Sequence, residues 1–459
     1  MIIFAGPYPL NMAEPQIAAV VAASSQPVEL PAAQRGISTA FLLVILALLV
    51  RLVMMLMAHG WHFVEATGPY PALFQNETTN ISACITNGYG YKSPFVSVLA
   101  GNPAVGPSSW VAPVYPYLCA AVFSAFGVFS RQSFFFLVVL QCVFSALTCI
   151  PILRVGELTV GRRAGIVAAA VWAVFPWFSQ WANTYIWEIN LSALLFLCLF
   201  WYALELERRR RWQPWVGFGA LWGFALLVNP ALLTLLAASL LWLAYRRSRT
   251  AFDWFKPTVL ALATCAVVIS PWLIRNRVVF GQWAFLRSNF GFEFWMANYH
   301  GSHGRDWAGR HPTANPQELA EYARVGELAY VHEKSQIAAQ FVREYLGEFL
   351  ALTAKRFLMY WDGSTIKYNY AAAPYWLSWS FLPLSLLFLP ALVYACARRV
   401  RAWPLFLGAI LLYPTPYYLT FCQARYRHAL EPLMLLLIAY AAVACFNFIR
   451  KPDQVAISR

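Results

Sequence analysis

Two glutamates of the first polar loop are the candidates for acid–base chemistry on the outer face of the N-terminal half of this chain. Residues 59–116 form a polar loop between two apolar stretches, and the loop contains Glu65, Glu77, a single cation, Lys92, and no aspartate. The first aspartate of the whole sequence is Asp253. A carboxylate beside a hydroxyl group can take its proton as a general base. If this face of the protein performs such catalysis, we expect Glu77 or Glu65 to be the base.

The composition is that of a polytopic membrane protein. Hydrophobic residues make up 60% of the 459 positions and charged residues only 12%, and the mean hydropathy is +0.54. A soluble globular chain is about one quarter charged. The net charge of +14 arises largely from short basic clusters beside apolar stretches, which is how cytoplasmic loops are marked. These clusters are Arg208 to Arg211, Arg246 with Arg247 and Arg249, Arg398 with Arg399 and Arg401, and Arg450 with Lys451. The clusters are not interleaved with exposed aromatic residues, so no nucleic-acid partner is predicted.

The apolar stretches predict an all-α fold with ten to twelve transmembrane helices and interfacial helices in the outer loops. The spans are expected at about 38–58, 111–129, 133–153, 164–182, 186–206, 214–228, 230–245, 256–273, 375–396, 403–421 and 429–449. The loop 59–110 and the cluster at Arg208 should lie on opposite sides of the membrane. Four crossings between them would place them on the same side. One segment between residues 111 and 206 must therefore be re-entrant, split or not a true span.

The same pattern divides the chain into regions. They are a cytoplasmic tail at 1–37 that is expected to be disordered, a transmembrane module at 38–273 that includes the first outer loop 59–110, an outer region at 274–374, C-terminal transmembrane helices at 375–450 and a cytoplasmic tail at 451–459. Residues 74–87 are expected to form a short surface helix at the membrane interface. In the outer region, apolar residues repeat every four positions from Ile337 to Phe349, which predicts one amphipathic helix over 332–359.

No metal site or cofactor is predicted. The nine cysteines show no CxxC motif and no paired spacing. His300, His303, Asp306 and His311 lie close in the sequence, but their spacing matches no pair on one helix face and glycine and proline intervene. We interpret them as part of an outer loop.

Five segments in a fixed order carry a resemblance to a known family. They are NGYGYKSPF at 87–95, APVYPYLCAAVFSAFG at 112–127, PWLIRNRVVFGQWAFLRSNFGFEFWMAN at 271–298, GELAYVHEKSQIAAQFV at 326–342 and RYRHALEPLMLLLIAYA at 425–441. Over roughly residues 38–450 the chain resembles the bacterial membrane glycosyltransferases of GT-C architecture. The nearest group is the RgtA/B/C/D-like and protein-mannosyltransferase-like family, which is related to the lipid A aminoarabinose transferase.

The resemblance implies an enzyme that moves a sugar from a polyprenyl-phosphate donor to a lipid, glycan or protein acceptor. The reaction would take place at the outer face of the inner (cytoplasmic) membrane, without a cofactor. The family's base is an acidic residue of the first outer loop. Glu77 lies eleven residues before Gly88, where many members of this subgroup have a glutamate. The better characterised members have an aspartate slightly earlier, where this chain has Leu73, Phe74 and Gln75.

The family pattern and the residue types together predict a site. The catalytic candidates are Glu77 and Glu65; the donor phosphate is expected to contact Lys92, Arg275, Arg425 and Arg427; and the donor or acceptor cavity is expected to include Asn80, Tyr91, Trp110, Tyr115, Glu188, Asn298 and Tyr426. Arginine can bind a phosphate through two parallel hydrogen bonds. An ionisable residue such as Glu188 in an apolar stretch is expensive and often functional, although a structural hydrogen bond would also explain it.

Two other functions are compatible with the sequence. A transporter or flippase of a lipid-linked or small substrate would also need many spans, but no internal repeat supports one. A non-catalytic scaffold of the GT-C type would explain the missing aspartate near residue 73.

Overall fold

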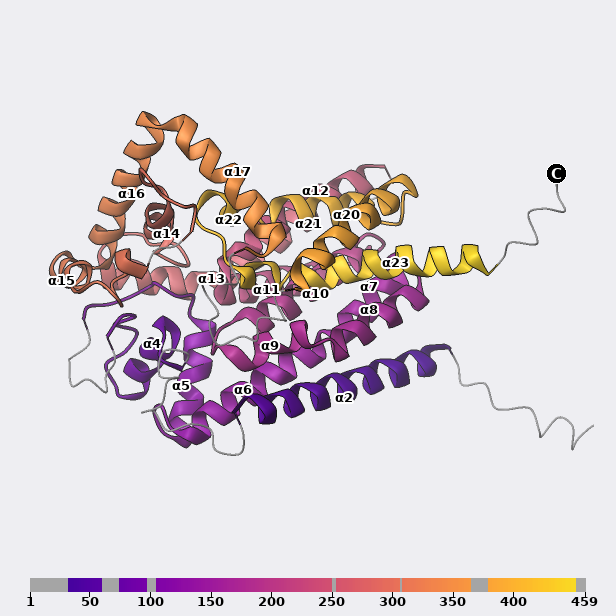
Figure 1. The fold of residues 1–459 in the computed structure, drawn as a ribbon, viewed down its shortest axis with the longest axis horizontal. Helices are drawn as coiled ribbons and strands as arrows, with labels where there is room; N and C mark the ends of the chain where they lie inside the picture. Colours follow the sequence, from indigo (N-terminus) through magenta and orange to yellow (C-terminus); the bar gives the residue numbers. More distant parts are fainter. Residues whose placement is uncertain are drawn as a thin grey trace, which may run out of the picture. The chain divides into compact units, whose positions relative to one another are not determined.

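The computed structural model describes residues 32–59, 74–96, 105–249, 253–305, 308–364 and 379–450. Glu65 and Asp306 lie outside these ranges. Residues 43–459 form one compact unit, and the account below concerns that unit. Its regular structure, in the described ranges, is helical apart from one isolated β-bridge between Lys92 and Pro107 (Figure 1). The predicted all-α membrane fold is therefore confirmed.

Among the described residues, five helical stretches are long and apolar enough to cross a membrane, or six if one bent pair is a single span. The five lie in α2 (Ala32–His59), in α6 and α7 (Arg131–Leu147 and Cys149–Thr159, taken together), in α10 (Ile189–Leu206), in α13 (Phe255–Phe280) and in α23 (Glu431–Ile449). The bent pair is α8 (Arg162–Val174) and α9 (Pro176–Thr184), which meet at 51°. Shorter apolar helices are α5 (Val114–Phe126), α11 (Gln213–Val228) and α20 (Phe381–Ala397). The full-length spans thus account for about half of the ten to twelve that the sequence predicts.

The short helix α5 removes the conflict in the number of crossings. The predicted span at 111–129 contains only the 13 residues of α5. At 1.5 Å per residue α5 is about 20 Å long, which is shorter than the roughly 30 Å of hydrocarbon in a bilayer. Without α5, three candidate crossings lie between the first loop and the cluster at Arg208: α6 with α7, the bent pair α8 and α9 taken as one span, and α10. An odd number of crossings puts the two segments on opposite sides, as the charge pattern requires.

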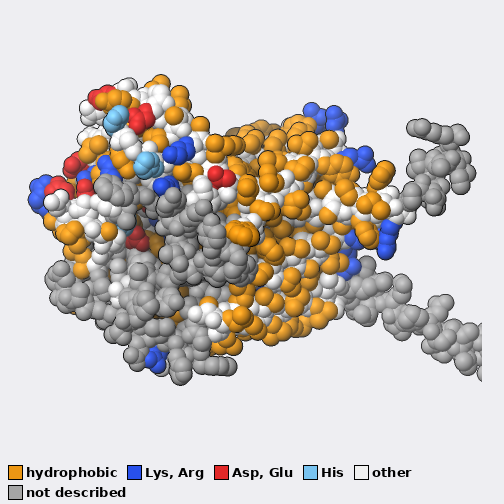
Figure 2. Space-filling view, in the orientation of Figure 1, with side chains coloured by type: hydrophobic (Ala, Val, Ile, Leu, Met, Phe, Trp, Pro, Cys, Tyr) orange, Lys and Arg blue, Asp and Glu red, His pale blue; other side chains and the backbone are white. Residues whose placement is uncertain are grey.

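The basic clusters from distant parts of the chain converge at one end of the bundle. Glu207, just after α10, accepts hydrogen bonds from Arg246 Nε (2.7 Å) in α12 (Leu233–Ser248) and from Arg401 Nη2 (3.0 Å) before α21 (Trp403–Leu412). Arg401 also donates to the Leu158 carbonyl of α7 (3.2 Å). We call this group the Glu207 cluster. In Figure 2, lysine and arginine without acidic side chains mark one end, apolar side chains cover the middle, and both charge signs occur at the other end.

The helices of the outer region gather at that other end, together with α4 (Glu77–Thr86) and α5 (Figure 1). They are α14 (Phe290–Ala297), α15 (Pro316–Val325), α16 (Glu327–Glu344) and α17 (Leu346–Asp362). The prediction of one helix over 332–359 is wrong, because the chain breaks at Tyr345, where φ is −126° and ψ is 48°. Helix α16 packs on α14, whereas α17 packs on α20 and α22 (Thr415–Leu419). The four-residue repeat continues through the break, so periodicity alone cannot detect it.

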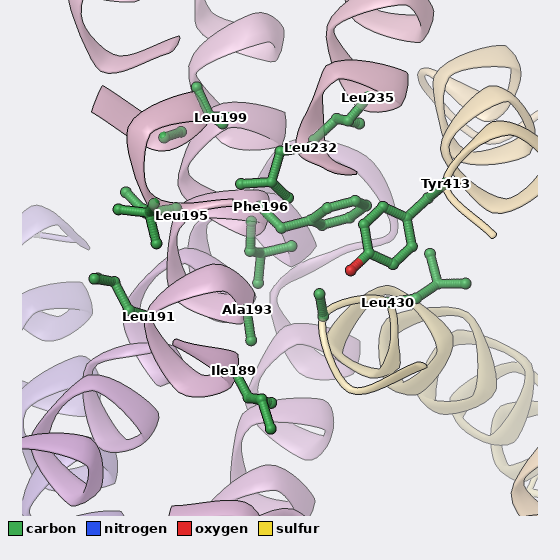
Figure 3. Close-up of a cluster of buried hydrophobic side chains, with 14 of the residues drawn as sticks. Ile189, Leu191, Ala193, Leu195, Phe196, Leu199, Leu232, Leu235, Tyr413 and Leu430 are labelled. Carbon is green, nitrogen blue, oxygen red and sulfur yellow. The ribbon is translucent and has the colours of Figure 1, made fainter. Parts of the chain in front are cut away.

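A cluster of buried apolar side chains lies where the start of α10, the tip of the α11–α12 hairpin and the end of α21 pack together. Figure 3 shows Phe196 of α10 between Leu232 and Tyr413, with Leu430 beside Tyr413. The rings of Phe196 and Tyr413 meet edge to face, with centroids 5.0 Å apart. Leu232 belongs to the short turn η2 (Pro230–Leu232) at the tip of the hairpin that α11 and α12 form. This packing fixes the starts of α10 and α12 relative to α21.

Candidate active site

A cavity of about 510 Å³ lies at the end of the bundle away from the Glu207 cluster. Helix α10 begins at the cavity and ends just before Glu207, so the cavity and the Glu207 cluster lie at opposite ends of this helix. Its lining comes from the starts of α4 and α10, the tip of the α11–α12 hairpin, α14 and the segment from α21 to η4 (Ala424–Arg427). The acidic, arginine and histidine side chains that line it are Glu77, Glu188, Glu293, Arg287, Arg425 and His311.

The local sequence fixes Glu77 at the first position of α4. Asn76 Oδ1 accepts hydrogen bonds from the amides of Thr78 (3.0 Å) and Thr79 (3.2 Å), and Thr79 Oγ1 accepts one from the Asn76 amide (3.0 Å). This reciprocal cap satisfies amides that a helix start leaves without partners. Asn76 Nδ2 also donates to the Ile186 carbonyl (3.2 Å), which ties α4 to the segment before α10. The cap therefore aims Glu77 at the cavity.

Helix α4 is not the surface helix that the sequence predicts. Its residues from Thr78 to Cys84 are buried. Ser82 Oγ donates to the Pro116 carbonyl of α5 (2.9 Å), and Asn80 Nδ2 donates to the Pro94 carbonyl (3.0 Å). The interfacial interpretation fails because α5, which is too short to cross the membrane, folds over α4 and covers it.

Glu77 is paired with a histidine from the outer region. His311 Nε2 lies 3.2 Å from Glu77 Oε1, and the two side chains are only 17% and 16% exposed. Burial acts to raise the pKa of Glu77, but the hydrogen bond and charge of His311, the backbone amide of Glu77 and the charge of Arg425 outweigh it. The net effect lowers the pKa of Glu77 below the usual carboxyl value. Glu77 is therefore ionised at neutral pH and can accept a proton.

Two arginines reach the same cavity from different elements. Arg425 lies in η4, and its guanidinium carbon is 4.6 Å from the ring centroid of Trp187 and 5.3 Å from that of Tyr426. Arg287 Nε donates to the Trp110 carbonyl (3.1 Å), just before α14. The Trp187 and Tyr426 rings and the Trp110 carbonyl position the two guanidinium groups at the cavity. Such an arrangement suits an anionic ligand, above all a phosphate.

A buried carboxylate holds the cavity wall that carries Arg287. Glu327, at the start of α16, accepts hydrogen bonds from the Ser109 amide (2.6 Å) and from Ser288 Oγ (2.7 Å). Ser109 precedes Trp110, and Ser288 follows Arg287, so one carboxylate fixes both segments. Burial raises the pKa of Glu327, and these hydrogen bonds act in the opposite direction.

A third acidic residue in the cavity titrates near neutral pH. Glu293 of α14 accepts a hydrogen bond from Asn289 Nδ2 (2.7 Å). Burial raises the pKa of Glu293 to about 7, although Arg287 and His311 act to lower it. The charge of the cavity therefore changes as the pH passes through about 7.

The structure brings five of the predicted site residues together. These are Glu77, Trp110, Glu188, Arg425 and Tyr426, all of which line the cavity. The remaining predicted residues within the described ranges lie elsewhere, and Glu65 is outside those ranges.

The other three predicted cations are engaged away from the cavity. Arg275 donates to the carbonyls of Ser108 (2.7 Å) and Tyr91 (3.1 Å). Arg427 is fully buried and pairs with Glu431 at 3.1 Å. The backbone of Lys92 forms the bridge to Pro107.

The predicted polar cavity residues that lie elsewhere are buried in the fold. Asn298 Nδ2 donates to the Leu419 carbonyl (2.9 Å), and Tyr91 OH donates to the Val111 carbonyl (2.7 Å). Tyr115 is buried in α5, and Asn80 is held by Pro94 as described above.

Sequence analysis did not assign Arg287, Glu293 or His311 to the site. Arg287 and Glu293 both lie in the quoted segment 271–298, so this segment was a signal for them. His311 was considered only as a metal ligand. Within the described ranges, no group of three or more histidine, cysteine, aspartate or glutamate side chains could hold a metal ion.

Comparisons with known proteins agree with this fold. Residues 110–274 match the family described as dolichyl-phosphate-mannose-protein mannosyltransferase. No curated protein matches the sequence. The oligosaccharyltransferase of Archaeoglobus fulgidus, solved with Zn and sulfate, is similar in structure with a TM-score of 0.52 and 15% identity, covering 89% of this chain and 49% of that one.

Two further solved structures are similar. The oligosaccharyltransferase AglB of Archaeoglobus fulgidus, in complex with an inhibitory peptide and a dolichol-phosphate, has a TM-score of 0.51 and 14% identity, over 92% of this chain and 52% of that one. ArnT from Cupriavidus metallidurans, bound to undecaprenyl phosphate, has a TM-score of 0.40 and 14% identity, over 88% of this chain and 77% of that one. This chain spans about half the length of the oligosaccharyltransferases that it matches.

Proposed function

We propose, on the premise that this chain has the fold of the GT-C membrane glycosyltransferases, that it transfers a sugar from a polyprenyl-phosphate donor to an acceptor. One observation carries the proposal: the cavity combines an ionised carboxylate, Glu77, with two arginines, Arg287 and Arg425. This is the charge arrangement that displacement of a sugar from a phosphate requires. The dolichol-phosphate in the AglB complex is a lipid phosphate of the class proposed here.

Glu77 serves as the base. As the acceptor hydroxyl attacks the anomeric carbon of the sugar, Glu77 takes the hydroxyl proton. The bond between the anomeric carbon and the phosphate oxygen breaks, and its electron pair leaves with the lipid phosphate. His311 keeps Glu77 ionised and oriented before the attack.

Arg287 and Arg425 bind the phosphate. The leaving phosphate gains negative charge as the bond breaks, and fixed cations stabilise that charge most when they need not move. The Trp110 carbonyl and the Trp187 ring hold the two guanidinium groups before substrate arrives. Both arginines therefore contribute to donor binding and to departure of the leaving group.

The orientation of the protein follows from the charges at its two ends. Basic residues near the ends of membrane helices favour the cytoplasmic side. The Glu207 cluster then faces the cytoplasm, and the cavity faces the outside of the cytoplasmic membrane. A lipid, glycan or protein acceptor reaches the cavity from that side, while the lipid donor reaches it from the bilayer.

Transfer in native membranes tests the proposal. Membranes that contain the overproduced protein are supplied with undecaprenyl phosphate carrying a radiolabelled sugar. We expect the label to move to an acceptor and undecaprenyl phosphate to be released, and the same membranes with Glu77→Gln to show neither. If the label crosses the bilayer while still attached to its lipid, the protein is a flippase. If no sugar leaves the lipid, the proposed function is wrong.

A further inference from the structure

One oxygen of the Glu188 carboxylate is buried at the cavity wall without a hydrogen-bond partner among the described residues. This oxygen is Oε2, and the residue as a whole is 5% exposed. Glu188 occupies the N-cap position of α10, where an acidic side chain can accept hydrogen bonds from the first amides of the helix. It makes no such bond here. Burying a carboxylate oxygen without a hydrogen-bond partner is costly, so a ligand that donates a hydrogen bond to this oxygen would gain affinity.

A hydroxyl group lies one turn further along the same helix. Ser192 lines the cavity and is 2% exposed. Residues four positions apart lie on the same helix face, so Glu188 and Ser192 approach the cavity together. Asn229 Nδ2 donates to Ser192 Oγ (3.2 Å), and Asn229 Oδ1 accepts a hydrogen bond from the Ala231 amide (3.1 Å). Because the Ser192 oxygen accepts from Asn229, the Ser192 hydroxyl keeps its proton for donation to another group.

These three residues form a polar floor on rigid support. We use the name polar floor for Glu188, Ser192 and Asn229. The start of α10 and the hairpin tip that carry the floor pack on the apolar cluster around Phe196 and Tyr413 (Figure 3). A floor held in this way can discriminate between ligands, because its groups cannot move to suit a wrong one.

We propose that the polar floor is the subsite for the transferred sugar and that it selects a neutral sugar whose hydroxyls donate to Glu188. The proposal rests on the proposed function, since the sugar is placed by a phosphate bound to Arg287 and Arg425 in the same cavity. Burial raises the pKa of Glu188, and the charges of Arg287 and Arg425 act in the opposite direction. In its ionised form the carboxylate only accepts hydrogen bonds, so it binds sugar hydroxyls and repels the carboxylate of a uronic acid. Ser192 donates to a ring or hydroxyl oxygen of the same sugar.

The role of Glu188 differs from that of Glu77. Glu77 comes from α4 and is paired with His311, whereas Glu188 comes from α10 and keeps one oxygen unpaired among the described residues. Loss of Glu77 should therefore remove turnover, whereas loss of Glu188 should weaken the binding of the sugar and leave the binding of the lipid phosphate intact.

Binding to a panel of lipid phosphates tests the subsite. The purified protein in nanodiscs is titrated with bare undecaprenyl phosphate and with undecaprenyl phosphate that carries glucose, mannose, galactose, glucosamine or glucuronic acid. Trp110 and Trp187 line the cavity, so intrinsic fluorescence reports occupancy. We expect at least one neutral hexose to improve affinity over the bare lipid about tenfold or more, as hydrogen bonds to a charged group allow. The glucuronate lipid should bind no better than the bare lipid.

Two variants and a matched control locate the effect. Glu188→Gln should lose about tenfold of the hexose advantage. It should bind bare undecaprenyl phosphate at least as tightly as wild type, because it removes a negative charge that acts on Arg287 and Arg425. Ser192→Ala removes a single oxygen and should lose a smaller part of the gain in affinity that the hexose gives. This variant provides a second test if Glu188→Gln does not fold. Glu205→Gln changes a partly exposed glutamate that pairs with Arg209 at the other end of α10, and it should leave all affinities unchanged.

The outcomes separate the subsite from the proposed function. If wild type does not bind bare undecaprenyl phosphate, the proposed function fails, and the subsite fails with it. If wild type binds the bare lipid but gains nothing from a neutral hexose, the subsite alone is wrong. The subsite is also wrong if the hexose advantage survives in Glu188→Gln, or if only the glucosamine or glucuronate lipid binds more tightly than the bare lipid.

Discussion

The change of Arg425 to glutamine is the sharpest test of how the donor phosphate is held. Arg425 lines the cavity and lies against the rings of Trp187 and Tyr426. Glutamine keeps much of the length of the side chain and its packing on these rings, but it removes the charge. A hydrogen bond between charged partners contributes about 1.5–3 kcal/mol net, and 1.4 kcal/mol corresponds to a factor of ten in affinity. We therefore expect Arg425→Gln to bind bare undecaprenyl phosphate roughly 10- to 150-fold more weakly than wild type.

The assay is a fluorescence titration in nanodiscs at fixed ionic strength. Arg277→Gln serves as the matched control, because Arg277 is an exposed arginine near the end of α13 and does not line the cavity. The control should bind the lipid with an affinity within about twofold of wild type. The free energies of unfolding of both variants should lie within about 1 kcal/mol of the wild-type value. Unchanged affinity in a folded Arg425→Gln protein would refute the assignment. An equal loss of lipid affinity in Arg277→Gln would show that the net charge of the protein, and not the position of Arg425, determines phosphate binding.

Three further changes test the electrostatics of the site and of its support. Since His311 lowers the pKa of Glu77, His311→Gln should raise that pKa and move the acidic limb of the pH profile of kcat/KM to higher pH; an unmoved limb would show that His311 does not act on the base. The pKa of Glu293 is about 7, so its carboxyl is neutral below that pH and negative above it. As the pH rises through about 7, binding of bare undecaprenyl phosphate to wild type should weaken relative to its binding to Glu293→Gln. The second ionisation of the phosphate, at a pKa of about 6, affects both proteins equally. A ratio of the two affinities that does not change with pH would exclude Glu293. Glu431 accepts hydrogen bonds from three buried side chains, those of Arg427, Trp177 and His428. Glu431→Gln should therefore lower the free energy of unfolding, measured by denaturant titration, by about 3–5 kcal/mol. A decrease of less than about 1 kcal/mol would contradict a stabilising buried ion pair.

The sequence predicts the class of protein and the presence of a short helix that carries Glu77, because both depend on local patterns. The prediction places this helix at 74–87, whereas α4 is Glu77–Thr86. Long apolar stretches with basic flanks indicate a helical membrane protein. Asn76 followed by Glu77 and two threonines is a typical helix start, and α4 begins at Glu77.

The sequence cannot tell which cations face the cavity. Arg425 and Arg427 lie two residues apart in the same turn, and by type and position each is an equally good candidate for the phosphate. The turn directs Arg425 to the cavity and Arg427 to the buried Glu431. His311 joins the site only because the outer region folds back over α4, and no local pattern around His311 indicates this contact.

Two predictions about the helices, the span at 111–129 and the single helix at 332–359, are wrong for related reasons. Hydropathy reports whether a segment is apolar, not whether it is straight or long enough, so α5 has the composition of a span although it is too short to be one. Periodicity reports which face is buried, not whether the helix is continuous. The break at Tyr345 is therefore invisible in the four-residue repeat, because α16 and α17 each bury one face against a different partner.

Sugar transfer by the Glu77→Gln protein tests the central claim most directly. Native membranes that contain wild type, Glu77→Gln or Glu65→Gln are supplied with undecaprenyl phosphate carrying a labelled hexose. Loss of a general base typically lowers turnover about 10²- to 10⁴-fold. We predict a loss of that size in Glu77→Gln alone, with binding of bare undecaprenyl phosphate kept within a few-fold of wild type. Wild-type turnover in folded Glu77→Gln, or loss of turnover in Glu65→Gln instead, would contradict the account.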